Sequence, residues 1–171
     1  MCIRDRYGGI IFYIANPPVD LDGDGSLDDG LVCATSDVAR HDWGCGYNTS
    51  LATSIGDGKS NTTSILNTCP SVTTAASLCD QYSVTISGIT YNDWFLPSKD
   101  ELTKMNENVG PAAASPNTNI ANFGANLNYD YWTSSGVSNT NAWSMYLNTL
   151  QWQNTSKNDA KNIRAVRAFK R

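Results

Sequence analysis

Apolar and polar positions alternate in short runs along much of the chain, a pattern that predicts β-strands. Residues 8–15 are apolar, β-branched or aromatic and stop before Pro17, as expected of a buried strand. Residues 31–34 predict its partner. A period of two returns later in the chain, where successive side chains would point to opposite faces. It predicts three further strands, at residues 129–134, 142–148 and 163–169.

Two segments show helical spacing instead. Residues 62–78 place apolar side chains close to one helical face, and Pro70 must break or restart that helix. Ser98 and Glu101 have the spacing of a capping box and precede Leu102, which predicts the start of a short second helix. Strands before and after two helices, without a βαβ repeat, indicate an α+β fold.

Composition narrows the class of protein. The chain has 171 residues, 40% hydrophobic, 16% charged and 10% aromatic, which predicts one folded domain rather than a disordered segment. It contains no run of about 18 apolar residues, so we expect no membrane insertion. Its net charge of −4 provides no basic field for a phosphate backbone. Nucleic acid is therefore not an expected partner.

The first six residues, MCIRDR, fit no element of this pattern. They resemble the translated sequencing-adapter tail that heads many metagenomic reading frames; a genuine start codon is the alternative. We exclude residues 1–6 from fold reasoning and expect a single domain over residues 7–171. On this interpretation the true N-terminus is missing, and the absence of a signal peptide says nothing about export.

The cysteines indicate an oxidising compartment. Cys2 is set aside with residues 1–6, and the other cysteines all lie in the first half of the chain. They show no CxxC spacing, and the whole sequence has a single histidine, so they do not indicate a zinc site. Two disulfides are expected, with buried free thiols as the alternative. Three connectivities are open, and the shorter loops favour two pairs. These are Cys33 with Cys45 and Cys69 with Cys79.

An acidic loop between the first two strands is a candidate calcium site. Its carboxylates alternate with glycine and serine at the spacing of an EF-hand or dockerin-like loop, and closely spaced carboxylates repel one another unless a hard cation lies among them. The last ligand position of such a loop normally carries a bidentate carboxylate, but here it is Leu31. The alternative is a solvated acidic turn. The candidate ligands are Asp20, Asp22, Asp24, Ser26 and Asp28.

A polar surface is expected on the C-terminal strands. Period two in residues 142–148 places Trp143 on the core face and Ser144 on the outward face. Beyond the next turn we expect the outward set to continue as Leu150, Trp152 and Asn154, with Trp152 as an exposed aromatic anchor. Of the 18 asparagines, 13 fall from Asn106 onward, so the amides concentrate there. The candidate ligand-binding residues are Ser138, Asn139, Asn141, Ser144, Tyr146, Asn148, Leu150, Trp152, Asn154 and Asn158.

Candidate catalytic groups have simpler structural explanations. His41 stands beside Asp42, but no nucleophile is fixed near it by sequence. Asp93, Asp100 and Glu101 form a set of carboxylates, although Glu101 is explained by capping and Asp100 by the helix dipole. We expect a protein that is not an enzyme.

Seven motifs resemble the bacterial DUF1566 family, also called the Legionella collagen-like protein C-terminal (Lcl) domain family, which is close to the Fibrobacter major paralogous domain. The most specific is Trp-Phe-Leu-Pro-Ser-Lys-Asp-Glu-Leu at residues 94–102. The others follow the family's order, at residues 8–13, 30–32, 43–45, 131–135, 142–143 and 166–169. The resemblance implies a C-type-lectin-like fold in which the N- and C-terminal strands pair, two helices pack on antiparallel strands, and a loop-rich C-terminal half presents a ligand surface.

The resemblance also implies a function in recognition. Some relatives are variable proteins of diversity-generating retroelements, and residues 136–162 look like such a variable region; an ordinary polar surface is the alternative. The sugar-binding tripeptides Glu-Pro-Asn and Gln-Pro-Asp are absent, and no cysteine follows Cys79, which disfavours calcium-mediated sugar binding and the oxidase chemistry found on this fold. We expect a non-enzymatic receptor- or adhesin-like module that binds a protein or glycan, secreted, on a cell surface or on a phage particle.

The alternative is a terminal adhesion domain of a larger, oligomeric surface protein that binds glycosaminoglycan through charge, as the family's namesake does. Its candidate surface is a basic stripe in the last fifteen residues. The stripe comprises Lys157, Lys161, Arg164, Arg167, Lys170 and Arg171. Pairing of these residues with the acidic N-terminal half is the competing interpretation.

Overall fold

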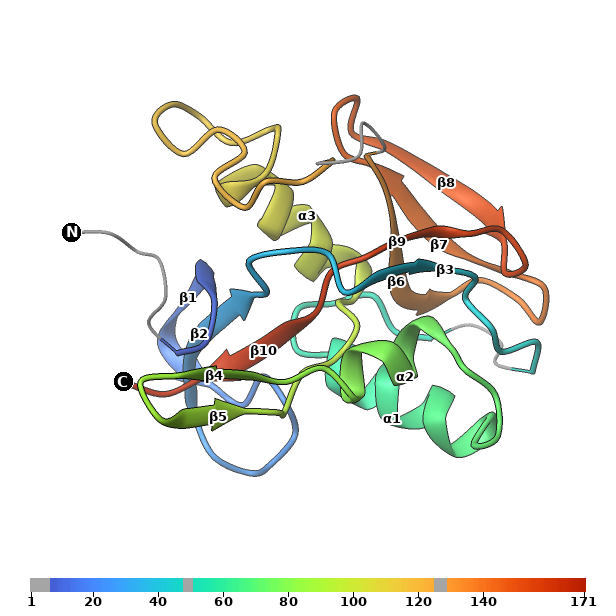
Figure 1. Cartoon of the computed structure of the whole chain (residues 1–171), viewed down its shortest axis with the longest axis horizontal. Helices are drawn as coiled ribbons and strands as arrows, with labels where there is room; N and C mark the ends of the chain where they lie inside the picture. The colour runs from blue at the N-terminus through green and yellow to red at the C-terminus, as the bar shows by residue number, and fades with distance from the viewer. Residues whose placement is uncertain (1–6, 48–50, 125–128) are drawn as a thin grey trace.

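The computed structural model describes residues 7–47, 51–124 and 129–171. The segment set aside above, residues 1–6, lies outside them. Helices and strands alternate irregularly along the described residues, which confirms an α+β chain (Figure 1). The helices are α1 (Gly58–Thr68), α2 (Ala75–Asp80) and α3 (Lys99–Val109). The strands are β1 (Ile10–Val19), β2 (Asp28–Cys33), β3 (Ala39–His41), β4 (Val84–Ile86), β5 (Ile89–Tyr91), β6 (Asp130–Gly136), β7 (Asn141–Tyr146), β8 (Gln151–Ser156), β9 (Lys161–Ile163) and β10 (Val166–Phe169).

Both ends of the domain belong to one small sheet of order β1-β2-β10. The expected direct pairing of the first and last strands is wrong, because β2 lies between β1 and β10 and pairs antiparallel with both. A larger sheet has the order β3-β9-β6-β7-β8, and β4 pairs with β5 in a hairpin. In Figure 1, α3 lies on one side of the strands and α1 and α2 lie on the other.

The predicted helices are confirmed, with boundaries set by caps. Ser98 and Glu101 form the capping box of α3. The interrupted helix is two helices, and Pro70 falls between them. The second of these, α2, has its own capping box, in which Thr74 and Ser77 bond to each other's backbone N–H groups.

The last predicted strand divides in two. Residues 163–169 contain the end of β9 and all of β10, and Arg164 and Ala165 carry the chain from the larger sheet to the smaller one. The short strands β3, β4 and β5 were not predicted, because three residues are too few to establish a period.

Indole rings fill much of the interior. Trp43, Trp94 and Trp132 are fully buried. Trp143, expected on the core face of its strand, is half-buried. One cluster of buried side chains packs around α3, β1 and Tyr131, and a second packs around α1, α2 and the three buried indoles.

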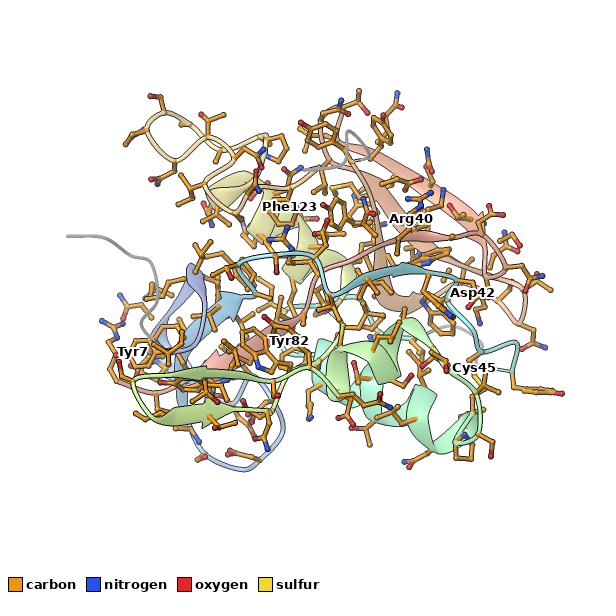
Figure 2. All side chains as sticks on the ribbon, viewed as in Figure 1. Tyr7, Arg40, Asp42, Cys45, Tyr82 and Phe123 are labelled. Atoms are coloured by element: carbon orange, nitrogen blue, oxygen red, sulfur yellow. A yellow bond between two sulfur atoms is a disulfide. The ribbon has the colours of Figure 1, made fainter. Side chains whose placement is uncertain are left out.

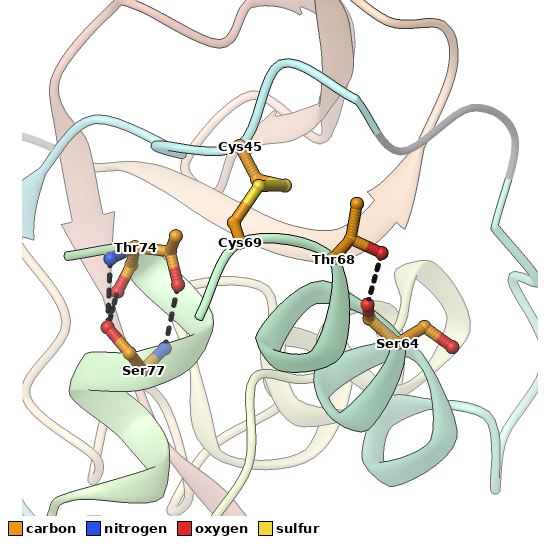
Figure 3. The surroundings of a disulfide bond; sticks show 6 residues. All are labelled: Cys45, Ser64, Thr68, Cys69, Thr74 and Ser77. Carbon is orange, nitrogen blue, oxygen red and sulfur yellow. Dashed lines mark hydrogen bonds between the residues drawn. A yellow bond between two sulfur atoms is a disulfide. The ribbon is translucent and has the colours of Figure 1, made fainter. Parts of the chain in front are cut away.

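The expected disulfide pairing is wrong. Cys45 bonds to Cys69, whereas Cys33 and Cys79 are buried free thiols. Loop length does not decide the pairing, because the fold brings the segment after β3 against the C-terminal end of α1, with the Cys45 and Cys69 Cα atoms 5.9 Å apart (Figure 3). Burial raises the pKa of the Cys33 thiol to about 11, so this thiol is protonated and unreactive at neutral pH.

The carboxylate of Glu101 joins the starts of α1 and α3. It is fully buried, and its Oε1 accepts hydrogen bonds from the backbone N–H groups of Gly56 at 2.9 Å and Gly58 at 3.4 Å. Its Oε2 accepts from the N–H of Ser98 at 2.8 Å. A Cβ at position 58 would lie 2.2 Å from that Oε2, so glycine is required there. Burial nevertheless raises the pKa of Glu101 to about 7.

We predict that Glu101 makes the domain less stable as the pH rises. Its pKa of about 7 in the folded protein exceeds the ordinary value of 4.5, so the folded state binds more protons between these values. The resulting stability is fully present below pH 4.5 and is lost as the pH rises through 7. Urea unfolding measures this effect as the difference in unfolding free energy between the parent and Glu101→Gln. This difference should fall by about 3 kcal/mol between pH 4.5 and pH 7. A difference that does not change with pH would contradict the prediction.

Candidate ligand-binding surface

The hairpin β7–β8 forms one edge of the larger sheet, and its register changes the predicted surface. Tyr146 pairs with Gln151, so residues 147–150 form a four-residue turn, and Met145 lies opposite Trp152. Directly opposed residues share a face. Trp152 therefore lies on the face of Met145, and Asn154 on that of Trp143, rather than on the face of Ser144. The expectation that Trp152 and Asn154 continue the outward set of β7 is wrong.

The ten predicted ligand-binding residues differ in exposure. Asn139, Asn148, Leu150, Asn154 and Asn158 are exposed; Ser138, Asn141, Tyr146 and Trp152 are half-buried. Ser144 is fully buried, so its assignment to the binding surface is wrong. Its Oγ lies 2.8 Å from the Oγ1 of Thr155 in a hydrogen bond between the two strands.

The turn between β6 and β7 uses two of the predicted residues for its own structure. The Oγ of Ser138 accepts hydrogen bonds from the N–H groups of Thr140 at 3.3 Å and Asn141 at 3.1 Å. The Oδ1 of Asn141 accepts from the Thr140 hydroxyl at 2.8 Å. Ser138 and Asn141 therefore shape the turn, and the exposed Asn139 is its outward-facing amide.

Trp152 belongs to an aromatic cluster that the sequence did not reveal. Its ring meets that of Trp143 edge to face, with centroids 6.3 Å apart. The ammonium of Lys99 lies 3.9 Å from the Trp143 centroid and 4.8 Å from that of Trp152, within the range of cation–π attraction. Lys99 is the first residue of α3, and its N–H donates to the Oγ of Ser135 at 3.1 Å. The capping box predicted where α3 begins, but not which strand its first side chain faces.

The acidic loop assembles three of its five predicted ligands. Asp20, Asp22 and Asp28 each have a carboxylate oxygen within 4.8 Å of the others. Asp28 is buried, which raises the pKa of its carboxyl group, and one of its oxygens accepts from the N–H of Leu21.

The other two predicted ligands of the loop contact a basic side chain. The Lys170 ammonium bonds to Asp24 Oδ2 at 2.9 Å and to the hydroxyl of Ser26. Hydrogen bonds from Ser26 and Lys170 lower the pKa of Asp24 to about 2. Calcium binding therefore stays a prediction, centred on three carboxylates rather than five ligands.

The basic stripe is engaged within the domain. Lys157 is buried, with its ammonium 4.2 Å from the centroid of the Trp43 ring. The other five residues pair with acidic side chains. The pairs are Lys161–Asp130, Arg164–Asp37, Arg167–Asp93, Lys170–Asp24 and Arg171–Asp29. Three of the partners, Asp24, Asp29 and Asp37, lie in the acidic N-terminal half, as the competing interpretation expected, whereas Asp93 and Asp130 lie in the second half of the chain.

The candidate catalytic groups are dispersed. The Nδ1 of His41 lies 2.9 Å from Asp42 Oδ1. Asp93 pairs with Arg167, and Glu101 caps α3. These contacts are structural, and the expectation of a protein that is not an enzyme stays a prediction.

Fold and surface together define an α+β domain that is crosslinked by a disulfide and presents an amide-rich hairpin at a sheet edge. The sequence model of the Lcl C-terminal domain family matches residues 39–167, which include every element from β3 to β9. The chain belongs to this family, as the motifs indicated. No curated protein matches the chain. In the described residues, no helix has the length and apolar character needed to cross a membrane.

We predict that Ca²⁺ binds the acidic loop and competes there with Lys170, whose ammonium lies 3.8 Å from Asp28 Oδ1. Isothermal titration should give a heat of binding that is lost in Asp20→Ala plus Asp22→Ala. Lys170→Ala should bind more tightly, because it removes the competing charge. Asp100→Ala, on α3, is the control. Absence of heat from the parent domain would contradict the prediction.

Proposed function

We propose that this domain is a non-enzymatic ligand-binding module of the receptor or adhesin type. The observation that carries the proposal is the cluster of Lys99, Trp143 and Trp152 at the edge of the larger sheet. Half-buried indoles lose little conformational entropy on binding and are the side chains most often found at binding hot spots.

The surroundings of the cluster suit recognition of a polar ligand. Asn154 lies opposite Trp143 and is exposed, and the turn that leads into β8 presents Asn148 and Leu150 to solvent. Amides donate and accept hydrogen bonds at once, so they accommodate both peptide groups and sugar hydroxyls. The ligand we propose is a protein or glycan on a cell surface.

A glycan ligand would be recognised by stacking and hydrogen bonding rather than by a basic field. Five of the six basic residues of the stripe are held in ion pairs and the sixth is buried, which leaves little support for a charge-driven glycosaminoglycan site. The terminal adhesion domain of an oligomeric surface protein stays the alternative role, with the same aromatic cluster as its contact.

The wider setting of the domain is also part of the proposal. The Cys45–Cys69 disulfide is typical of an oxidising environment, and we propose an extracellular location, on a cell surface or phage particle. We propose a C-type-lectin-like fold, supported by the sheet shared by both ends of the domain and by the helices on either side of the strands.

We predict that Trp152→Ala weakens binding to any glycan that the labelled parent domain retains on an array, by about tenfold or more, which corresponds to the loss of a hot-spot side chain. Lys99→Ala should weaken it less, since it removes one cation–π partner. Ile89→Ala, an exposed apolar residue on β5, is the matched control. Thermal melts establish that each variant is folded. Equal binding by Trp152→Ala would place the ligand elsewhere.

We further propose that residues 136–162 are diversified by a retroelement, and we predict where the variation falls. Deep sequencing of the locus in its native population should find substitutions at the exposed Asn148, Asn154 and Asn158. Ser144 should be spared, because it is fully buried and a larger side chain would disrupt packing. Uniform drift along the chain would contradict diversification.

A further inference from the structure

Strand β8 leaves one edge of the larger sheet unpaired. It is the last strand in the order β3-β9-β6-β7-β8, and in Figure 1 it lies on the outside of that sheet. All six of its residues pair with β7 in consecutive register. Among the described residues, no strand pairs with its other side. An edge of this kind presents a row of backbone N–H and C=O groups that can pair with a further strand.

The other strand edges in the described part of the chain carry features that prevent such pairing. β1 contains Pro17 and Pro18 and has shifts in register, and β10 meets Phe95 in a β-bridge. β3, β4 and β5 have three residues each. Figure 2 shows the charged Arg40 on β3, at the opposite edge of the larger sheet from β8. Proline, charge, irregular register and short length all protect an edge. β8 has six residues, none of them charged and none of them proline.

The hydrogen bonds of β7 establish which backbone groups of β8 face outward. The carbonyl of Trp143 accepts from the hydroxyl of Thr133 on β6 at 2.9 Å, so it points away from β8. Trp143 lies opposite Asn154. The two therefore form a pair without mutual backbone hydrogen bonds, and the N–H and C=O of Asn154 point away from β7. The N–H of Lys157 donates to the carbonyl of Thr140 at 2.8 Å, which indicates the same alternation.

The outward groups are accessible to a further strand. By the same alternation, the backbone groups of Trp152 and Ser156 also face outward, and Asn154 and Ser156 are exposed. The carbonyl of Asn154 accepts from Asn141 Nδ2 at the long distance of 3.5 Å. The carbonyl of Ser156 accepts from the N–H of Asp159 at 3.0 Å. Each carbonyl oxygen has a second lone pair for another donor.

We propose that β8 pairs antiparallel with β8 of a second copy of this chain. The outward residues are spaced symmetrically about Asn154. A two-fold axis at Asn154 therefore places Asn154 opposite its own equivalent, and Trp152 opposite Ser156 of the other copy. The two five-stranded sheets become one continuous sheet. This inference goes beyond the proposed function and does not depend on it.

Charge favours a second copy as the occupant of this edge. The chain carries a net charge of −4, so two copies repel each other over much of their surface. Residues 151–156 carry no charge, so this edge brings two copies together without like charges directly opposed. A side chain on the two-fold axis meets its own equivalent, which disfavours a charged residue there. The amide of Asn154 suits this position, because it both donates and accepts hydrogen bonds.

The pairing also determines how the candidate ligand-binding surfaces are arranged. A two-fold axis perpendicular to the sheet leaves the same face of both copies on the same side. The two clusters of Lys99, Trp143 and Trp152 would then share one face of the joined sheet, where a ligand with repeated groups would engage both. This consequence rests on the proposed function, whereas the pairing of the strands does not.

Sedimentation equilibrium of the chain between about 10 μM and 1 mM tests the pairing. The parent should show a monomer–dimer equilibrium in this range. Asn154→Lys opposes two ammonium groups at the two-fold axis and should weaken dimerisation by about tenfold or more. Asn117→Lys adds the same charge at an exposed position in the loop after α3 and should dimerise as the parent does. A parent that stays monomeric overturns the proposal, including the case in which this edge pairs with a different protein. A dimer that is unchanged in Asn154→Lys overturns it as well.

Amide hydrogen exchange, followed by NMR at about 0.05 mM and about 1 mM protein, assigns the interface to β8. The N–H groups of Asn154 and Ser156 point outward, so they should exchange more slowly at the higher concentration. Those of Gln153 and Thr155 face β7 and are already bonded in the monomer, so they should change less. Exchange that does not depend on concentration at Asn154 places the interface elsewhere and overturns the proposal.

A second variant covers the case in which Asn154→Lys does not fold. Asn154→Pro removes an N–H that points away from β7, so it leaves the hydrogen bonds between β7 and β8 in place. It should abolish the dimer, because the two central hydrogen bonds of the pairing are lost. Thermal melts establish that each variant is folded. A folded Asn154→Pro that dimerises as the parent does overturns the proposal.

Discussion

The arrangement of the two larger sheets depends on the hydrogen bonds and the ion pair made by the guanidinium of Arg164. Its side chain is 1% exposed and lies where the chain passes from β9 to β10. It donates to Asp37 Oδ1 at 2.8 Å and to the carbonyls of Ala34 and Ala121 at 3.0 and 2.7 Å. Asp37 also accepts from the hydroxyl of Tyr131. One buried ion pair thus joins the segment between β2 and β3, strand β6 and the segment after α3. The hydrogen bonds to the guanidinium compensate for its loss of hydration.

Further ion pairs connect the last strand to distant parts of the chain. Arg167 bonds to Asp93 through two nitrogens. Lys170 bonds to Asp24 in the loop between β1 and β2, and the backbone N–H of Arg171 donates to Asp29 in β2. Charge that looks separated along the sequence is therefore neutralised in the fold.

Local signals predicted local structure, and contacts between distant segments decided the rest. The capping box of Ser98 and Glu101 correctly placed the start of α3, since both partners lie within one helical turn. The Cys45–Cys69 bond and the approach of Lys99 to Trp152 depend on how whole elements pack. No spacing in the sequence encodes them. The outward set of the hairpin was mispredicted because the length of the turn, and hence the register, is not a property of either strand.

The register that this turn sets decides which side chain of β8 lies beside Lys99. Residues 147–150 bring Trp152 opposite Met145, and a shift of one residue in this pairing would move every side chain of β8 to the other face. Trp152 would then leave Lys99, and Gln151 or Gln153 would take its place. A substitution within the hairpin changes one side chain of this face, whereas an insertion or deletion that shifts the pairing by one residue would replace the whole set.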